Sequence, residues 1–166
     1  MSGRGVHFAL TAEQEARLLA AVGDDDLVLE IVGEVEEVWD RSHLMESDKA
    51  WEAIHRCFCN GKLLYEGGEY PLNHFICGGR QMLLDEDPDM TVSYVSTPAV
   101  ADVAAAAKAI TKEEMQSRYK LIKQRGYGAK LGTEDFEFAW SNFLDLTKFY
   151  AAAATSGRAV VFSVDC

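Results

Sequence analysis

The chain has 166 residues, of which 27 are acidic and 16 are Lys or Arg, so its formal net charge is −11. Hydrophobic residues make up 48% of the chain and charged residues 26%, which suffices for a core and excludes a disordered chain. A length of this order fits one domain, and we expect a single domain over residues 1–166.

The apolar runs and the cysteines indicate a cytoplasmic protein. The longest apolar runs, 103–107 and 149–154, are far shorter than the roughly 18–20 residues that a membrane span needs, and no leader-like segment opens the chain. Four cysteines are too few for a disulfide scaffold in a chain of this size. We expect no membrane association and reduced thiols.

The charge is unevenly distributed. Residues 1–107 carry 20 acidic and 7 basic side chains, whereas residues 108–130 carry 2 and 7. Proteins that bind phosphate backbones concentrate Lys and Arg, so we expect no nucleic acid partner. An acidic field speeds encounter with cationic proteins and also keeps a chain in solution, so a basic protein partner and plain solubility both remain open.

The first third of the chain predicts one strand and three helices. A β-type run at 6–10 precedes a capping box of Thr11 and Gln14, which predicts a helix ending at Gly23. A second helix begins near Asp24, and its predicted core stripe is Leu27, Ile31, Val35, Val38 and Trp39. Ser47 or Asp48 is expected to cap a third helix ending at Cys59, whose predicted core face is Trp51, Ile54, His55 and Phe58.

The remainder predicts loops, two strands and three more helices. Turn-rich residues 61–71 precede a helical turn at 72–77, a polar loop at 85–89 and a strand at 90–96. Helices are expected from the Thr97 cap to about Ile110, from the Thr111 capping box onward, and over 134–156 after a Thr133 cap. A last strand is expected at 159–164. The predicted fold class is therefore α+β, with about six helices on a small, mostly antiparallel sheet that includes both terminal strands.

The reactive residues form no specific catalytic or metal motif. His55 and Cys59 are four apart on one helix face, but no second ligand pair with zinc-site spacing accompanies them, so we expect no metal and no cofactor. A thiol and an imidazole from Cys59 or Cys77 with His55 or His74 could also meet in space. Residues 126–132 miss the spacing of a phosphate-binding loop, although the nearby basic cluster could hold an anion at the following helix start; the cluster is Arg118, Lys120, Lys123, Arg125 and Lys130.

Several segments resemble one family along most of the chain. The segments are Asp48 to His55 followed by Asn60-Gly61, Pro71-Leu72 with Ile76 and Gly78-Gly79, Tyr94 to Val100, the Tyr127 loop, the long aromatic helix and the closing Val-Val-Phe-x-Val strand. In this order they resemble the YfbM-like family of small bacterial proteins of unknown function. Gly128, where the family often has Pro, and the thiols of Cys57 and Cys59 depart from the pattern. The resemblance implies a single α+β domain and no settled activity.

Two functional hypotheses follow. The first is a non-enzymatic acidic module of the bacterial cytoplasm that binds a basic protein partner, in an immunity or stress setting. The second is a small-molecule or anion-binding domain, including a hydrolase or transferase with His55 as base. In that case Trp51, His55, Tyr127, Arg125 and Lys130 would line one pocket, whereas the alternative places the Trp51 and His55 rings in the core. The oligomeric state is not predicted.

Overall fold

The strands form one antiparallel sheet in the order β2-β1-β5-β4-β3. The computed structural model describes residues 3–85 and 89–165, so residues 86–88 of the predicted polar loop lie outside it. The strands within these two ranges are β1 (Gly5–Ala9), β2 (Leu44–Asp48), β3 (Arg80–Gln81), β4 (Met90–Val95) and β5 (Val160–Asp165). The predicted pairing of the two terminal strands is confirmed, because β1 and β5 are neighbours at the centre of the sheet.

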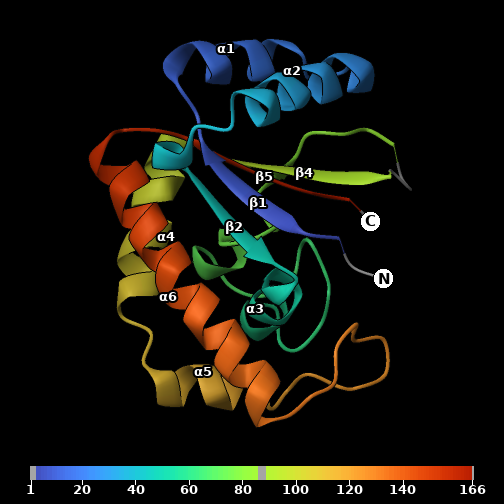
Figure 1. Cartoon of the computed structure of the whole chain (residues 1–166), viewed down its shortest axis with the longest axis vertical. Coiled ribbons are helices and arrows are strands. Elements are labelled where there is room, and N and C mark those ends of the chain that lie inside the picture. The colour runs from blue at the N-terminus through green and yellow to red at the C-terminus, as the bar shows by residue number, and fades with distance from the viewer. Residues whose placement is uncertain (1–2, 86–88, 166) are drawn as a thin grey trace.

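Helices cover both faces of this sheet (Figure 1). The α-helices in the described residues are α1 (Ala12–Ala20), α2 (Asp25–Val38), α3 (Ala50–Phe58), α4 (Thr97–Lys108), α5 (Lys112–Tyr119) and α6 (Thr133–Thr155). Short 3-10 helices occupy η1 (Arg41–His43) and η2 (Leu72–His74). Helices α1 and α2 lie on one face and α3 to α6 on the other, which confirms the predicted fold class.

The alternation of side chains along the central strands builds two cores. Phe8 and Val161 pack with the buried residues of α1 and α2, whereas Ala9 and Phe162 pack with those of α3, α4 and α6. Successive side chains of a strand point to opposite faces, so a central strand covered on both sides is apolar at nearly every position. This explains the apolar run from Val160 to Phe162.

Two caps predicted for α3 are wrong. Ser47 and Asp48 belong to the edge strand β2, and the residue before α3 is Lys49, which makes no side-chain capping bond. Ser47 is buried and its hydroxyl donates to the carbonyl oxygen of Gly5 over 3.3 Å. The caps at Thr11 and Thr111 are confirmed, and Asp24 caps α2. The predicted caps at Thr97 and Thr133 are wrong, because Ser96 caps α4 and α6 starts after Gly132 without a side-chain cap.

The predicted core stripe of α2 is partly wrong. Leu27 and Val38 are exposed, and the residues of α2 that are buried are Val28, Ile31, Val32 and Val35. Leu27, Val28 and Leu29 are consecutive apolar residues, so more than one stripe satisfies helical periodicity. Packing against Phe8 and its neighbours on the sheet selects the stripe that is buried.

Candidate functional site

Trp51 and His55 point into the protein from α3, as their helical spacing predicts. The Trp51 indole N–H donates to the carbonyl oxygen of Gly3 over 2.9 Å, and its ring lies 5.8 Å from that of Phe162. His55 is 1% exposed and its Nε2 lies 2.8 Å from the carbonyl oxygen of Leu64. Both rings are therefore part of the packed interior.

The charge state of His55 follows from this environment. Burial lowers the pKa of the imidazole, the hydrogen bond to Leu64 opposes this change, and the Arg56 charge adds to it. A carbonyl oxygen can only accept, so Nε2 carries the proton and the Nδ1 lone pair faces the Cys59 sulfur 4.0 Å away. At neutral pH His55 is a neutral ring.

Tyr127 belongs to a separate, partly buried network. Its hydroxyl donates to Oδ2 of Asp135 over 2.7 Å, and the Tyr119 hydroxyl donates to the same oxygen over 2.6 Å. Burial, followed by these bonds, raises the pKa of both phenols, so they stay protonated. The Arg56 guanidinium lies 5.7 Å from the Tyr127 ring centre and also pairs with Glu52. This network joins α3, α5, α6 and the loop before α6.

Arg125 and Lys130 are exposed on that loop. Lys130 lines a cavity of about 480 Å³ with residues 131–135 and Phe138, and α6 begins there without a side-chain cap. Trp51, His55 and Tyr127 line neither this cavity nor the larger one described next. The five residues selected from the sequence therefore occupy three environments: the core, the Asp135 network and the surface.

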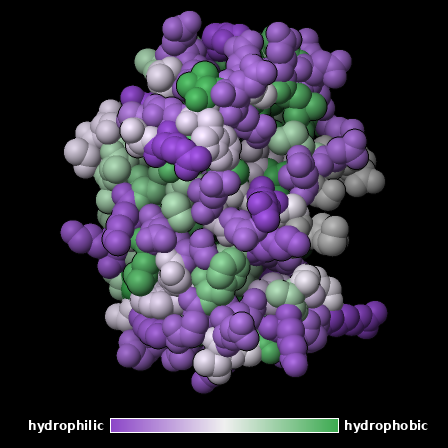
Figure 2. Space-filling model, in the orientation of Figure 1, coloured by the Kyte–Doolittle hydropathy of each residue, from purple (hydrophilic) through white to green (hydrophobic). Residues whose placement is uncertain are grey.

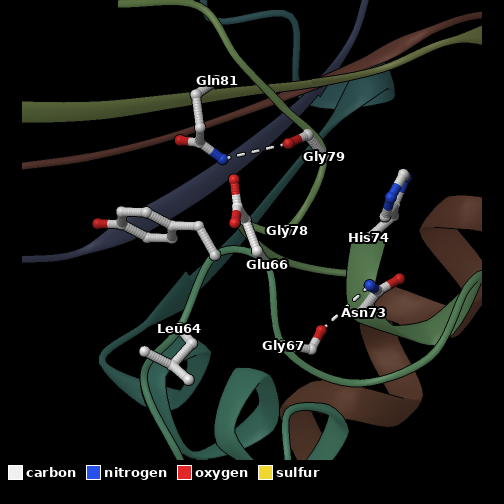
Figure 3. A pocket seen from close by; sticks show the side chains of 9 residues that line it. Leu64, Glu66, Gly67, Asn73, His74, Gly78, Gly79 and Gln81 are labelled. Carbon is white, nitrogen blue, oxygen red and sulfur yellow. Dashed lines mark hydrogen bonds between the residues drawn. The ribbon is translucent and has the colours of Figure 1, made fainter.

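The larger cavity, of about 780 Å³, lies between the loop after α3 and strand β3 (Figure 3). Its lining residues are Leu64, Tyr65, Glu66, Gly67, Asn73, His74, Gly78, Gly79 and Gln81. Glu66 comes from the loop and His74 from η2, and both line the cavity, with Glu66 near the middle of this view and His74 to its right. We call this the 64–81 cavity.

Both amide side chains of the 64–81 cavity have a fixed orientation. The NH2 group of Gln81 donates to the carbonyl oxygens of Cys77 over 2.6 Å and Gly79 over 3.2 Å, and that of Asn73 donates to Gly67 over 3.1 Å (Figure 3). Because the backbone oxygens can only accept, the amide nitrogens must face them. The side-chain oxygen of Gln81 is left as an acceptor, whereas Oδ1 of Asn73 is buried away from solvent and has no hydrogen-bond partner among the described residues.

The cavity lining carries negative charge and no positive side chain among the described residues. Glu66 is the ionised side chain of the lining, and none of the described lining residues is Lys or Arg. Burial lowers the pKa of His74, so at neutral pH its ring is neutral and one nitrogen can accept a hydrogen bond. The polar side chains thus offer a carboxylate, the amide oxygen of Gln81 and an imidazole nitrogen to a bound molecule. This set suits a hydrogen-bond donor that carries positive charge.

Sequence reasoning does not select Glu66, Asn73 or Gln81, and it considers His74 only for metal or thiol chemistry. The available signal is the pair of Gly-Gly steps at 67–68 and 78–79. A Cβ atom at Gly78 would lie 1.9 Å from the carbonyl oxygen of Asn73, and one at Gly68 would lie 2.0 Å from that of Phe58. Such close backbone approaches mark where this irregular segment folds on itself.

The sequence raised metal binding and thiol–imidazole chemistry as two possibilities, and the geometry bears on both. Within residues 3–85 and 89–165, no three His, Cys, Asp or Glu side chains are grouped so that they could hold a metal ion. Burial raises the pKa of the Cys57 thiol to about 12 and that of the Cys59 thiol to about 11, so both are protonated at neutral pH.

No helix in the described part of the chain has the length and apolar character to cross a membrane.

Comparisons with known proteins agree with this fold. The profile of a family described as "Domain of unknown function (DUF1877)" matches residues 1–163. No curated protein matches the chain. The solved structure of YfbM from Escherichia coli, described as a protein of unknown function, is similar with a TM-score of 0.69, 15% sequence identity and 99% coverage of each chain. The chain therefore belongs to the DUF1877 family, as its resemblance to the YfbM-like family predicted.

Proposed function

We propose that this protein is a non-enzymatic binding module and that its 64–81 cavity receives a cationic side chain from a basic segment of a partner protein. The observation that carries the proposal is the set of acceptors around the cavity. Glu66 supplies a carboxylate, and the orientation of Gln81 leaves its side-chain oxygen for a ligand. Hydrogen bonds between ionised groups are about twice as strong as neutral ones, so an ammonium or guanidinium group fits best.

The surroundings of the cavity support a protein segment as the source of that group. Leu63, Leu64 and Tyr65 are exposed on the loop that forms one wall, which offers apolar contact next to the charged position. Hydrophilic residues dominate the face of the protein in Figure 2, and the net charge of −11 steers basic partners toward it. A peptide that carries both cationic and apolar side chains matches both features.

Binding is favoured over catalysis at His55. The imidazole is buried, its Nε2 is engaged with Leu64, and the neighbouring thiol of Cys59 is protonated. A general base must reach the proton that it abstracts. The bond to Leu64 and the burial of the ring both support a structural use of His55.

The test is a titration with two labelled peptides that differ only in charge. One is a decapeptide of alternating Arg and Leu, and the other has citrulline at each Arg position. We expect the arginine peptide to bind and the citrulline peptide not to bind. Glu66→Gln should weaken binding about tenfold, because a charge-assisted hydrogen bond contributes about 1.5–3 kcal/mol. Glu69→Gln, on an exposed loop residue outside the lining, should change the affinity less than twofold.

Other results would contradict the proposal. Equal binding of the two peptides, or an unchanged affinity in Glu66→Gln, would rule out the proposed cation site at Glu66. Binding of spermidine with no binding of the arginine peptide would favour a small-molecule ligand over a protein. Inorganic phosphate tests the anion alternative: a rise in melting temperature that disappears in Lys130→Ala would place function at Arg125 and Lys130 instead.

A further inference from the structure

Two side chains on α3 hold the loop that forms one wall of the 64–81 cavity. Nε2 of His55 donates to the carbonyl oxygen of Leu64 over 2.8 Å, and the Cys59 thiol donates to that of Gly67 over 3.5 Å. His55 and Cys59 are one helical turn apart, and each is 1% exposed. Leu64 and Gly67 both line the cavity.

The contact at Gly67 also involves Asn73, another residue of the cavity wall. The carbonyl oxygen of Gly67 accepts from the Cys59 thiol and also from Nδ2 of Asn73 over 3.1 Å. The second bond turns Asn73 so that its Oδ1 is the atom left without a protein partner. A Cβ atom at Gly67 would lie 3.4 Å from Cβ of Cys59, so the loop packs directly on this side chain. The position of Gly67 therefore determines how the Asn73 side chain is held in the wall of the cavity.

We propose that His55 and Cys59 form a clasp that positions residues 64–67 and thereby sets the arrangement of acceptors in the cavity. They are positioning residues that do not touch the ligand. The ligand-binding part of this inference rests on the proposed function, whereas the effect on the loop does not.

The same atoms argue against a catalytic thiol–imidazole pair. Such a pair acts as a thiolate beside an imidazolium, and that state requires a lowered thiol pKa. Burial here raises the pKa of Cys59 to about 11 and lowers that of His55, so both groups are neutral. In the neutral state each has one hydrogen, and each has a loop carbonyl oxygen within reach.

The test compares variants that keep or remove the hydrogen-bond donor. His55→Gln keeps an N–H donor near the position of Nε2, and His55→Leu keeps volume but removes the donor. The loop contains a trypsin site after the exposed Lys62, and a second exposed loop supplies an internal reference site after Lys123. Native-state digestion followed by mass spectrometry gives the ratio of the two cleavage rates. This ratio reports local opening of the loop after α3.

We expect His55→Leu to raise the ratio about tenfold and His55→Gln to change it less than about threefold, from the net contribution of one hydrogen bond. Cys59→Ala should raise it by a few-fold, since the thiol is a weaker donor. Cys57→Ala removes a buried thiol from the same helix that is not part of the proposed clasp, and it should leave the ratio unchanged. An unchanged ratio in both His55→Leu and Cys59→Ala, or an equal rise in Cys57→Ala, would overturn the clasp.

The arginine peptide provides the second readout. If the clasp sets the acceptor geometry, His55→Leu weakens peptide binding about tenfold and His55→Gln restores it. Absence of peptide binding by the wild type would overturn the proposed function, and the cleavage ratio would still decide the clasp. A raised ratio with unchanged peptide affinity in His55→Leu would overturn the link between the clasp and the cavity.

Discussion

His7 and Tyr150 donate hydrogen bonds to the same acceptor, the carbonyl oxygen of Phe75. Nε2 of His7 lies 3.0 Å from this oxygen and the Tyr150 hydroxyl 2.7 Å, and the two rings are 5.8 Å apart. A carbonyl oxygen has two lone pairs and can accept both bonds. One backbone group thus connects β1, α6 and the segment that leads to the 64–81 cavity.

This arrangement predicts a pH-dependent stability. Burial lowers the pKa of His7 from 6.5 to about 4, with the Phe75 bond opposing the change. Between these values the unfolded chain binds a proton that the folded chain excludes, so stability falls as the pH falls. From pH 7 to pH 5 the loss due to His7 is about 2 kcal/mol. Urea unfolding at the two pH values measures it.

His7→Phe is the matched control for that measurement. The substitution removes the titrating ring, while Tyr150 continues to satisfy the Phe75 carbonyl. It also removes Nδ1, which has no hydrogen-bond partner among the described residues. We expect a stability within about 1 kcal/mol of the wild type at pH 7 and a pH dependence reduced by about 2 kcal/mol. An identical pH dependence in both proteins would rule out His7 as the source.

The Glu52–Arg56 pair predicts a large loss of stability when one partner is removed. Arg56 binds the Glu52 carboxylate over 3.0 Å and the carbonyl oxygen of Gly126 over 2.7 Å, and both side chains of the pair are less than one tenth exposed. Arg56→Met would leave Glu52 buried without its partner, which costs about 3–5 kcal/mol. Chemical denaturation measures the change in the free energy of unfolding.

Arg118→Met serves as the comparison for this pair. Arg118 pairs with Glu114 at the same helical spacing and the same 3.0 Å distance, but both side chains are about one third or more exposed. We expect a cost within about 1 kcal/mol. The double variant Glu52→Gln/Arg56→Met should recover part of the loss, because no unpaired charge stays buried. Equal costs for the two arginine substitutions would contradict a role for burial.

Two glycines predict opposite responses to alanine. Gly33 lies within α2 and a Cβ atom there would meet nothing within 4 Å, so Gly33→Ala should stabilise the protein by about 0.5–1 kcal/mol. At Gly78 the Cβ atom would lie 1.9 Å from a backbone oxygen, which cannot move without displacing Asn73. Gly78→Ala should lower the melting temperature, as forced contacts cost about 1–3 kcal/mol. A stabilising Gly78→Ala would show that this segment is not tightly folded.

Sequence periodicity predicts the long elements because burial and helical spacing agree there. In α3 the predicted residues Trp51, Ile54, His55 and Phe58 are buried, but the helix is buried on all sides, so the spacing alone does not predict the burial of Glu52 and Arg56. Strand β2 is missed because it is an edge strand of five residues whose Ser47 and Asp48 are common helix caps. Its identity depends on pairing with β1, more than thirty residues away. Local patterns do not contain that information.

The candidate site is less predictable than the fold. Glu66, Asn73 and Gln81 come from irregular segments and meet only because the chain folds back between α3 and β3. Their useful property is the orientation of each amide, which depends on the carbonyl oxygens of Gly67, Cys77 and Gly79. His55, which the sequence favoured as a base, lies behind this wall.

The strand order also constrains how the polypeptide is made. Strand β5 lies between β1 and β4, yet of the described strands it is the last to leave the ribosome. Until then β1 and β4 cannot be joined, and the apolar surfaces that they present to both cores remain uncovered on the nascent chain. Completion of the sheet therefore depends on pairing between strands that are distant in sequence, which makes folding slow.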